Sequence, residues 1–188
     1  MKTKLWIKIL IPILIFAVIV GIFLIKNSQK TNETLSNPQS STPIAEELKD
    51  ADFSLRSTTA INFEELSKFG LPIIVDYGAD TCIPCKAMAP VLEKANKVFS
   101  GKAFVKFINV WDYPDAANNV PVQLIPTQVI FDADGKPFIP SDALAAEIEF
   151  TMYSDKNTNE HIFTVHQGGL TEEEMWAILA EMGVYPDD

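Results

Sequence analysis

The stretch Leu71-Pro-Ile-Ile-Val-Asp-Tyr-Gly-Ala79 runs almost directly into Cys82-Ile-Pro-Cys85, which holds the only two cysteines of the chain. The apolar run is too continuous for a half-exposed strand, so it predicts a central strand covered on both faces. A helical pattern follows, which places Cys82 at a helix start, where free backbone N–H groups and the helix dipole favour a thiolate. Because the thiolate is the form that attacks disulfides, this placement predicts redox chemistry.

The spacing of the two cysteines suits a reversible dithiol, because three helical positions amount to about one turn and Cys85 can close a disulfide with Cys82. A zinc site is disfavoured, since it needs four ligands and the only histidines, His161 and His166, lack a zinc-finger spacing. A purely structural disulfide would stabilise little, because so short a loop removes little entropy from the unfolded chain. A third alternative remains: a domain that has kept the Cys-Ile-Pro-Cys motif but works as a binding module.

One acidic residue, Asp76, interrupts the apolar run of the predicted central strand. Burial there would raise the pKa of its carboxyl group and hold it near the value useful for moving a proton. The alternative is that the alternation of the strand turns Asp76 toward solvent.

The N-terminus predicts a membrane anchor. Residues 9–25 are uncharged and lie between Lys8 and Lys26, and this length suffices for one crossing when the apolar residues before Lys8 extend it. A cleaved signal peptide is the alternative, but its apolar region would be shorter and no small-x-small cleavage site follows Val20. Lysines are concentrated before the run, so the positive-inside rule predicts that the rest of the chain lies on the extracytoplasmic side of a bacterial cell membrane.

The distribution of charge and the composition along the 188 residues distinguish a linker and a domain after the predicted anchor. Past Lys30 there are ten Lys and Arg residues against all 25 Asp and Glu residues, a net charge of −15, compared with −10 for the whole chain. So acidic a domain disfavours nucleic acid and anionic lipid surfaces as partners. Residues 27–44 are rich in Ser, Thr, Asn, Gln and Pro and predict a disordered linker. The predicted organisation is an anchor over 1–26, the linker over 27–44 and one domain over 45–188.

Helical and strand patterns alternate within the domain, which favours an α/β fold. Asn62 caps a predicted helix over 62–69, and Thr171 with Glu174 forms the capping box of another over 171–182. Further strands are predicted over 103–111 and 127–131, with a short helix over 114–119 between them.

A series of short motifs in a fixed order resembles the thioredoxin family over roughly residues 45–185. The motifs are Val75-Asp-Tyr-Gly-Ala79, Cys82-Ile-Pro-Cys-Lys86, Ala89-Pro90, Ile125-Pro126-Thr127, Asp134-Gly135 and Gly168-Gly-Leu170. The chain is also similar to membrane-anchored thioredoxin-like proteins of bacteria that work with a polytopic thiol transporter of the cytochrome c biogenesis type. The resemblance implies a thioredoxin-like fold, in which helices flank a central mixed sheet.

The resemblance also assigns roles to residues. It makes Cys82 the nucleophile, Cys85 the resolving thiol and Asp76 the buried carboxylate that handles the proton of Cys85. Pro126 would be a cis-proline beside the disulfide, where Ile125 offers its backbone to an extended substrate segment. The remaining expected substrate-binding residues are Gly168 in the groove and Thr81, Ile83 and Pro84 around the dithiol. No cofactor is implied beyond the redox-active disulfide.

Three positions depart from the family pattern. Thr81 stands where the family usually has Trp, and Ile83 replaces a common Gly and exposes an apolar side chain. The lysine that often neighbours the buried acid is Phe107 here, and the adjacent Lys106 would face the other way in a regular strand.

The largest departure is an insertion over residues 139–160, before the last strand at 161–167. Residues 147–153 alternate polar and apolar side chains and residues 155–159 are rich in turn formers, which predicts an extended hairpin. It is either a partner-specific surface or a loop without a role.

The resulting hypothesis is a membrane-tethered, extracytoplasmic thiol–disulfide oxidoreductase that reduces protein disulfides and receives electrons from a transmembrane thiol donor. A disulfide-forming oxidase and a noncatalytic binding or chaperone module are the alternatives.

Overall fold

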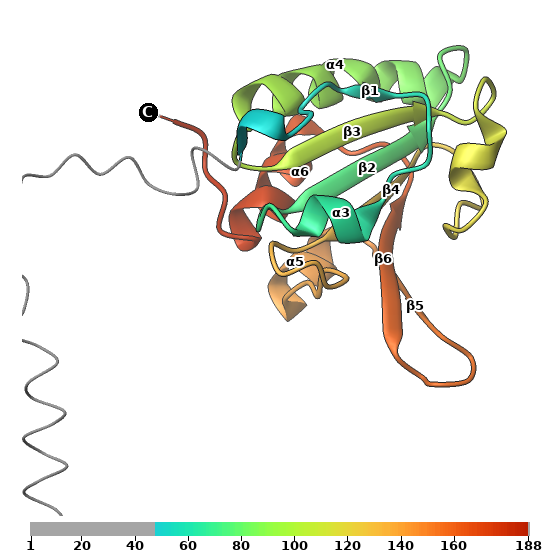
Figure 1. Ribbon diagram of the computed structural model, residues 1–188, viewed down its shortest axis with the longest axis vertical. Coiled ribbons are helices and arrows are strands. Elements are labelled where there is room, and N and C mark those ends of the chain that lie inside the picture. Colours follow the sequence, from blue (N-terminus) through green and yellow to red (C-terminus); the bar gives the residue numbers. More distant parts are fainter. Residues whose placement is uncertain (1–47, 188) are drawn as a thin grey trace, which may run out of the picture. The chain divides into compact units, whose positions relative to one another are not determined.

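Six strands build the central sheet of the domain, in the order β1-β3-β2-β4-β6-β5 (Figure 1). The structure is a computed structural model of the chain and describes residues 48–187. The strands are β1 (Arg56–Ser57), β2 (Ile73–Gly78), β3 (Phe104–Asn109), β4 (Thr127–Phe131), β5 (Thr151–Ser154) and β6 (His161–Gln167). The predicted anchor over 1–26 and linker over 27–44 lie outside the described residues. Within residues 48–187, no helix has the length and apolar character that a membrane crossing needs.

The strand predicted from the apolar run lies in the middle of this sheet. All six residues of β2 are buried, and β2 pairs in parallel with β3 and antiparallel with β4. The expected mixed sheet is therefore confirmed. A strand covered on both faces can be apolar at every position, which explains why β2 lacks the alternation of a half-exposed strand.

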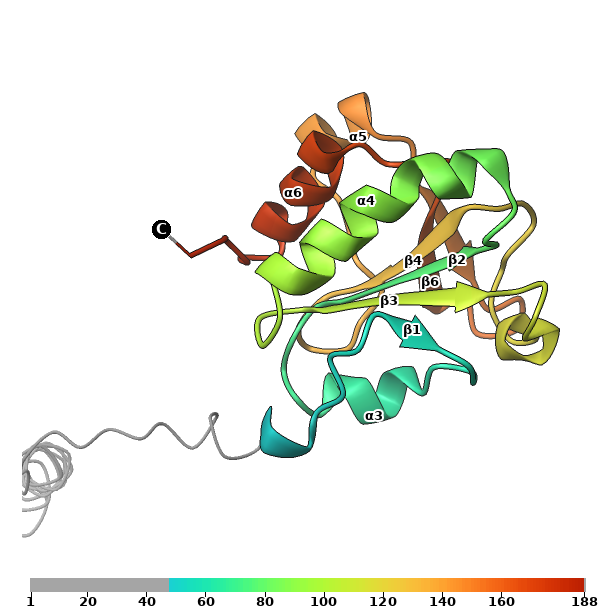
Figure 2. The ribbon, with the colours of Figure 1, turned by 90° about the horizontal axis from the view of Figure 1, so that it is seen from above.

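Helices cover both faces of the sheet (Figure 2). On one face lie α4 (Ile83–Val98), α5 (Asp142–Glu147) and α6 (Glu172–Glu181), whose apolar residues join a core that includes Ile74 and Ile130. On the other face lies α3 (Phe63–Ser67), whose Phe63 and Leu66 pack against a second core. Two short 3-10 helices, η1 (Leu48–Asp50) and η2 (Pro114–Ala117), complete the described elements.

The two predicted N-caps, Asn62 and Thr171, are confirmed. Asn62 accepts a hydrogen bond from the backbone N–H of Glu65 and starts α3. Thr171 and Glu174 form a complete capping box at α6. Because each cap satisfies N–H groups that have no partner inside the helix, it fixes where the helix begins.

The insertion differs in part from the predicted hairpin. The second half of the insertion does belong to a hairpin, because β5 pairs antiparallel with β6, the strand that follows the insertion. The prediction that the extended segment begins at Glu147 is wrong, because residues 142–147 form α5 and β5 begins only at Thr151. Ser141 caps α5, and Leu144 and Ile148 are buried in the core beside α6. This packing stabilises a helix too short to be stable alone.

Candidate active site

The two cysteines lie where the chain leaves β2 and enters α4. Cys82 is the N-cap residue of α4, and its sulfur accepts a hydrogen bond from the backbone N–H of Cys85 at 3.4 Å. The two residues form a disulfide, with their Cα atoms 5.3 Å apart. The predicted position at a helix start is thus confirmed, and in the reduced protein the same N–H group would stabilise a thiolate on Cys82.

The two sulfur-bearing residues differ in exposure. Cys82 is half-buried, whereas Cys85 is 4% exposed. An incoming disulfide can therefore approach Cys82, while the buried Cys85 can reach only the sulfur of Cys82. This asymmetry matches the predicted division into nucleophile and resolving thiol.

The carboxyl group of Asp76 lies inside the protein, so the alternative of a solvent-facing side chain is wrong. Asp76 is 0% exposed. Burial raises the pKa of Asp76 to about 7, and a hydrogen bond from the amide of Gln128 opposes this rise. Near neutral pH, Asp76 can therefore both take up and release a proton.

Asp76 is also close to the resolving cysteine. A Cβ placed on Gly78 would lie 3.1 Å from Oδ2 of Asp76 and 3.4 Å from the sulfur of Cys85. The two groups thus border one small space that only a glycine leaves open. The same point is 2.9 Å from a ring carbon of Phe107, so the Phe107 ring closes this space from β3.

The strand β3 places Lys106 away from the acid, as expected. Phe107 pairs with Asp76 in the register of β2 and β3. Lys106 lies on the opposite face, where its Nζ donates to the Ser54 carbonyl at 2.8 Å and to Asp52 at 3.0 Å. Among residues 48–187, Asp76 therefore has no lysine beside it, and Gln128 is its hydrogen-bond partner.

The predicted substrate groove borders the disulfide. The Ile125–Pro126 peptide bond is cis, as the resemblance implied, and the carbonyl oxygen of Ile125 lies 3.9 Å from the sulfur of Cys82. Gly168 has a φ of 121° and donates its N–H to the Pro126 carbonyl at 2.9 Å. Ile125 and Gly168 are both half-buried. Their backbone is thus positioned to face an extended segment next to Cys82.

The rim of the dithiol is accessible. Ile83 is 82% exposed, and its neighbours Thr81 and Pro84 are also exposed. Two further apolar residues are exposed. Trp111 lies after the end of β3, and Leu124 lies directly before Ile125. Neither was among the predicted site residues, although a tryptophan at the end of the strand predicted over 103–111 was a usable signal.

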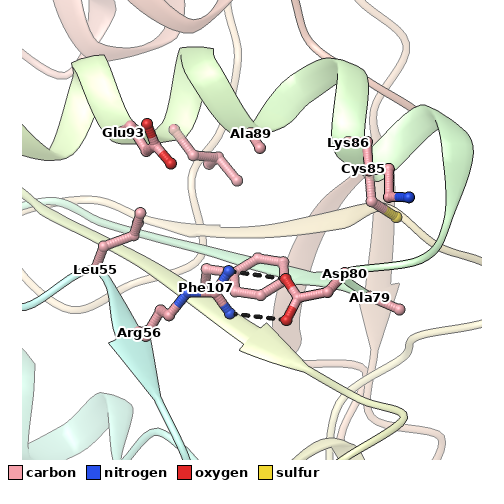
Figure 3. A pocket seen from close by; sticks show the side chains of 10 residues that line it. Leu55, Arg56, Ala79, Asp80, Cys85, Lys86, Ala89, Glu93 and Phe107 are labelled. Atoms are coloured by element: carbon pink, nitrogen blue, oxygen red, sulfur yellow. Dashed lines mark hydrogen bonds and ion pairs between the residues drawn. The ribbon is translucent and has the colours of Figure 1, made fainter.

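A small pocket of about 50 Å³ opens behind Cys85 (Figure 3). Cys85 and Lys86 border it from α4, and Phe107 borders it from β3. The guanidinium of Arg56 lies over the Phe107 ring and forms two hydrogen bonds with the carboxylate of Asp80. The pocket is large enough to admit water to the resolving sulfur.

Gln128 is the site residue that sequence reasoning missed. It is 0% exposed and lies on β4 directly opposite Asp76. The sequence did offer a signal: in the strand predicted over 127–131, Gln128 is the one amide side chain, and the residues after it are apolar.

The two histidines lie on β6, outside the dithiol. Ring nitrogens of His161 and His166 lie within hydrogen-bond distance of the Phe163 and Glu149 carbonyl oxygens, respectively. Within residues 48–187, no group of three or more His, Cys, Asp or Glu side chains is arranged to hold a metal ion.

The chain is similar to several known proteins. Residues 54–152 match the sequence profile of the family described as Thioredoxin. A thioredoxin of Alicyclobacillus acidocaldarius is 31% identical over 96 residues, covering 48% of this chain and 90% of the relative. A thioredoxin of Staphylococcus saprophyticus is 37% identical over 97 residues, covering 48% and 91%. The X-ray structure of Fasciola hepatica thioredoxin is similar with a TM-score of 0.46 and 21% identity, covering 69% of this chain and 99% of that chain.

Proposed function

Because this chain belongs to the thioredoxin family of thiol–disulfide oxidoreductases, we propose that it reduces protein disulfides on the extracytoplasmic side of a membrane to which residues 1–26 tether it. The observation that carries the catalytic part is the pairing of half-buried Cys82 with buried Cys85 at the start of α4, beside Asp76. The tether and its orientation rest on the apolar run over 9–25 and the lysines before it.

The reaction proceeds in two exchanges. The Cys82 thiolate attacks one sulfur of a substrate disulfide, forms a mixed disulfide and releases the other substrate sulfur as a thiolate. Cys85 then loses its proton to Asp76 and attacks the sulfur of Cys82. The Cys82–Cys85 disulfide forms, the bond to the substrate breaks, and the second substrate sulfur leaves with the electron pair. The substrate gains two electrons, which the dithiol loses.

Substrate binding uses the backbone beside Cys82. The Ile125 carbonyl faces the disulfide region, and a peptide in extended conformation can pair with it as an added strand. The exposed side chain of Ile83 provides apolar contact at the rim. The preferred substrate is therefore a protein whose disulfide lies in an extended, accessible segment.

A reductase in this location needs an electron supply. The extracytoplasmic space is generally oxidising, so the oxidised dithiol must be reduced again by a donor that draws on the cytoplasm. We assign this role to a transmembrane thiol protein of the cytochrome c biogenesis type. An oxidase would instead pass its electrons to an acceptor.

The reduction potential of the dithiol decides the direction. Equilibrating the full chain, purified in detergent, with glutathione buffers measures this potential. A value near that of thioredoxin, about −270 mV, supports the reductase, whereas a value near about −120 mV identifies an oxidase.

The tether has a separate test. Full-length protein and a variant without residues 1–26 are expressed in bacteria, and membranes are washed with carbonate. We expect only the full-length chain to stay with the membrane, and an impermeant thiol reagent to label its cysteines in intact cells after reduction. Full-length chain in the soluble fraction would contradict the tether without affecting the redox chemistry.

A further inference from the structure

A row of three polar side chains crosses the sheet under α4. Asp76 on β2 pairs with Gln128 on β4, and Gln128 pairs with His166 on β6. Residues directly opposite one another on paired strands share a face, so all three lie on the same side of the sheet. Gln128 is the middle member and is completely buried. Burying an amide this deeply costs free energy for each of its groups without a hydrogen bond. Among the described residues, Oε1 of Gln128 has no partner, so the amide nitrogen makes the hydrogen bonds of this side chain.

The amide nitrogen of Gln128 has two oxygen acceptors. Nε2 lies 2.5 Å from Oδ1 of Asp76 and 3.1 Å from the carbonyl oxygen of Gly168. It also lies 3.3 Å from the sulfur of Met88, a weak acceptor. An amide nitrogen carries two hydrogens, so it can serve both oxygens at once. The reverse orientation of the amide would set its oxygen against two acceptors, which fixes the nitrogen on this side.

This contact makes the two oxygens of Asp76 unequal. Oδ1 accepts from Gln128, whereas Oδ2 has no hydrogen-bond partner among the described residues and borders the space over Gly78 next to the sulfur of Cys85. A proton is favoured on the oxygen that accepts no hydrogen bond. The oxygen that faces Cys85 is therefore the one free to take its proton.

We propose that Gln128 is a positioning residue of the disulfide exchange: it holds Oδ1 of Asp76, leaves Oδ2 to receive the Cys85 proton, and links the carboxyl group to Gly168. The inference rests on the proposed function and concerns its second exchange. In that step the proton of Cys85 passes to Oδ2, the Cys85–Cys82 bond forms, and the bond from Cys82 to the substrate breaks, with the electron pair leaving on the substrate sulfur.

The surroundings of Asp76 contain few other charges. From α4, the sulfur of Cys85 borders the same point over Gly78 as Asp76, and from β3 Phe107 pairs with Asp76. Lys106 lies on the opposite face with Asp52, and His166 is one strand beyond Gln128. Gln128 thus makes the one side-chain hydrogen bond to Asp76 among the residues that the structure describes, and it acts against the effect of burial.

The test separates the two exchanges in time. The reduced full chain in detergent is mixed in a stopped-flow instrument with 5,5′-dithiobis(2-nitrobenzoate), an aromatic disulfide whose thiolate is coloured. The first release reports attack by Cys82, and the second reports resolution by Cys85. In Gln128→Met, which keeps the length but loses the donor, Asp76 should stay protonated to higher pH. We expect the pH midpoint of the second phase to rise by about one unit, as loss of a charged hydrogen bond implies.

Two controls and a second variant isolate the contact between Gln128 and Asp76. Thr164→Val removes another buried hydroxyl of the same sheet, which donates to the Phe138 carbonyl, and should leave the midpoint of the second phase in place. In an Asp76→Asn background, Gln128→Met should have no effect on that midpoint. If Gln128→Met does not fold, Gln128→Glu keeps the size and polarity and should raise the midpoint through its own carboxylate.

Two results would overturn the inference: an unchanged midpoint in the folded Gln128 variant, or a shift that persists without Asp76. A wild-type chain that shows no second phase would instead refute the proposed function. The two failures are therefore distinguishable.

Discussion

Oδ2 of Asp76 and the sulfur of Cys85 border the same point over Gly78, at 3.1 and 3.4 Å from the position of a Cβ there. The two residues are nine positions apart in the chain and meet because β2 leads through a short loop into α4, which turns back over the strand. The acid and the resolving thiol thus form one buried unit.

Asp76 should make the protein less stable as the pH rises from about 4 to about 7. Burial raises the pKa of Asp76 from 3.8 to about 7, so across this window the unfolded chain ionises while the folded chain stays protonated. The unfolded state then binds fewer protons, and the free energy of unfolding falls. Asp76→Asn should remove this loss and exceed the wild type by up to about 4 kcal/mol near pH 8 in urea titrations.

Asp52→Asn is the matched control, because its shift has the opposite sign. Hydrogen bonds from Ser54, and then from Lys106, lower the pKa of Asp52 to about 2. Its contribution is present above the unfolded pKa and is lost as the pH falls, so Asp52→Asn should be less stable than the wild type near pH 8. A gain for Asp76→Asn that does not change with pH would contradict the assignment.

Gly78→Ala should disturb the site by crowding it. The new methyl group would lie 2.9 Å from the Phe107 ring and would push between Asp76 and Cys85. We expect a loss of about 1–3 kcal/mol in the free energy of unfolding and a slower second exchange. Gly169→Ala is the control, because its nearest neighbour beyond the adjacent residues, the Pro84 carbonyl oxygen, is at an ordinary 3.9 Å. Equal losses for the two variants would refute the crowding.

The two cysteines should fail in different ways when each is changed to serine. Cys82→Ser should lose exchange with protein disulfides, since Cys85 is buried and cannot reach an incoming substrate. Cys85→Ser should still attack and should accumulate a mixed disulfide with the substrate, which mass spectrometry of the intact protein detects. Retained turnover in Cys82→Ser would contradict its role as nucleophile.

Ser141→Ala tests the helix that the sequence did not predict. The Ser141 hydroxyl accepts from the N–H of Leu144 at 3.3 Å and donates to Glu181 of α6 at 2.8 Å. Loss of this N-cap should cost about 1 kcal/mol in thermal or urea unfolding. Ser154→Ala, on the exposed face of β5, should change stability by much less; an equal loss would argue against the cap.

Much of the fold and the dithiol could be predicted because their determinants are local. The apolar run of β2, the caps at Asn62 and Thr171, and the position of Cys82 before a helical pattern all depend on residues within a few positions. The insertion could be predicted only in part. Alternation over 147–153 suits a strand, but burial of Leu144 and Ile148 beside α6 stabilises a short helix over 142–147 and delays the strand to Thr151.

The position of the dithiol, the acidic residue Asp76 inside an apolar strand and the motifs of the family around them can all be read from the order of the residues. The folded chain was needed to show that Gln128 binds Asp76 and Gly168, and that Asp76 and Cys85 meet over Gly78. The register between β2, β4 and β6 joins segments far apart in the chain. No local pattern encodes which side chains such pairing brings together, because the register depends on the packing of the whole sheet against its helices.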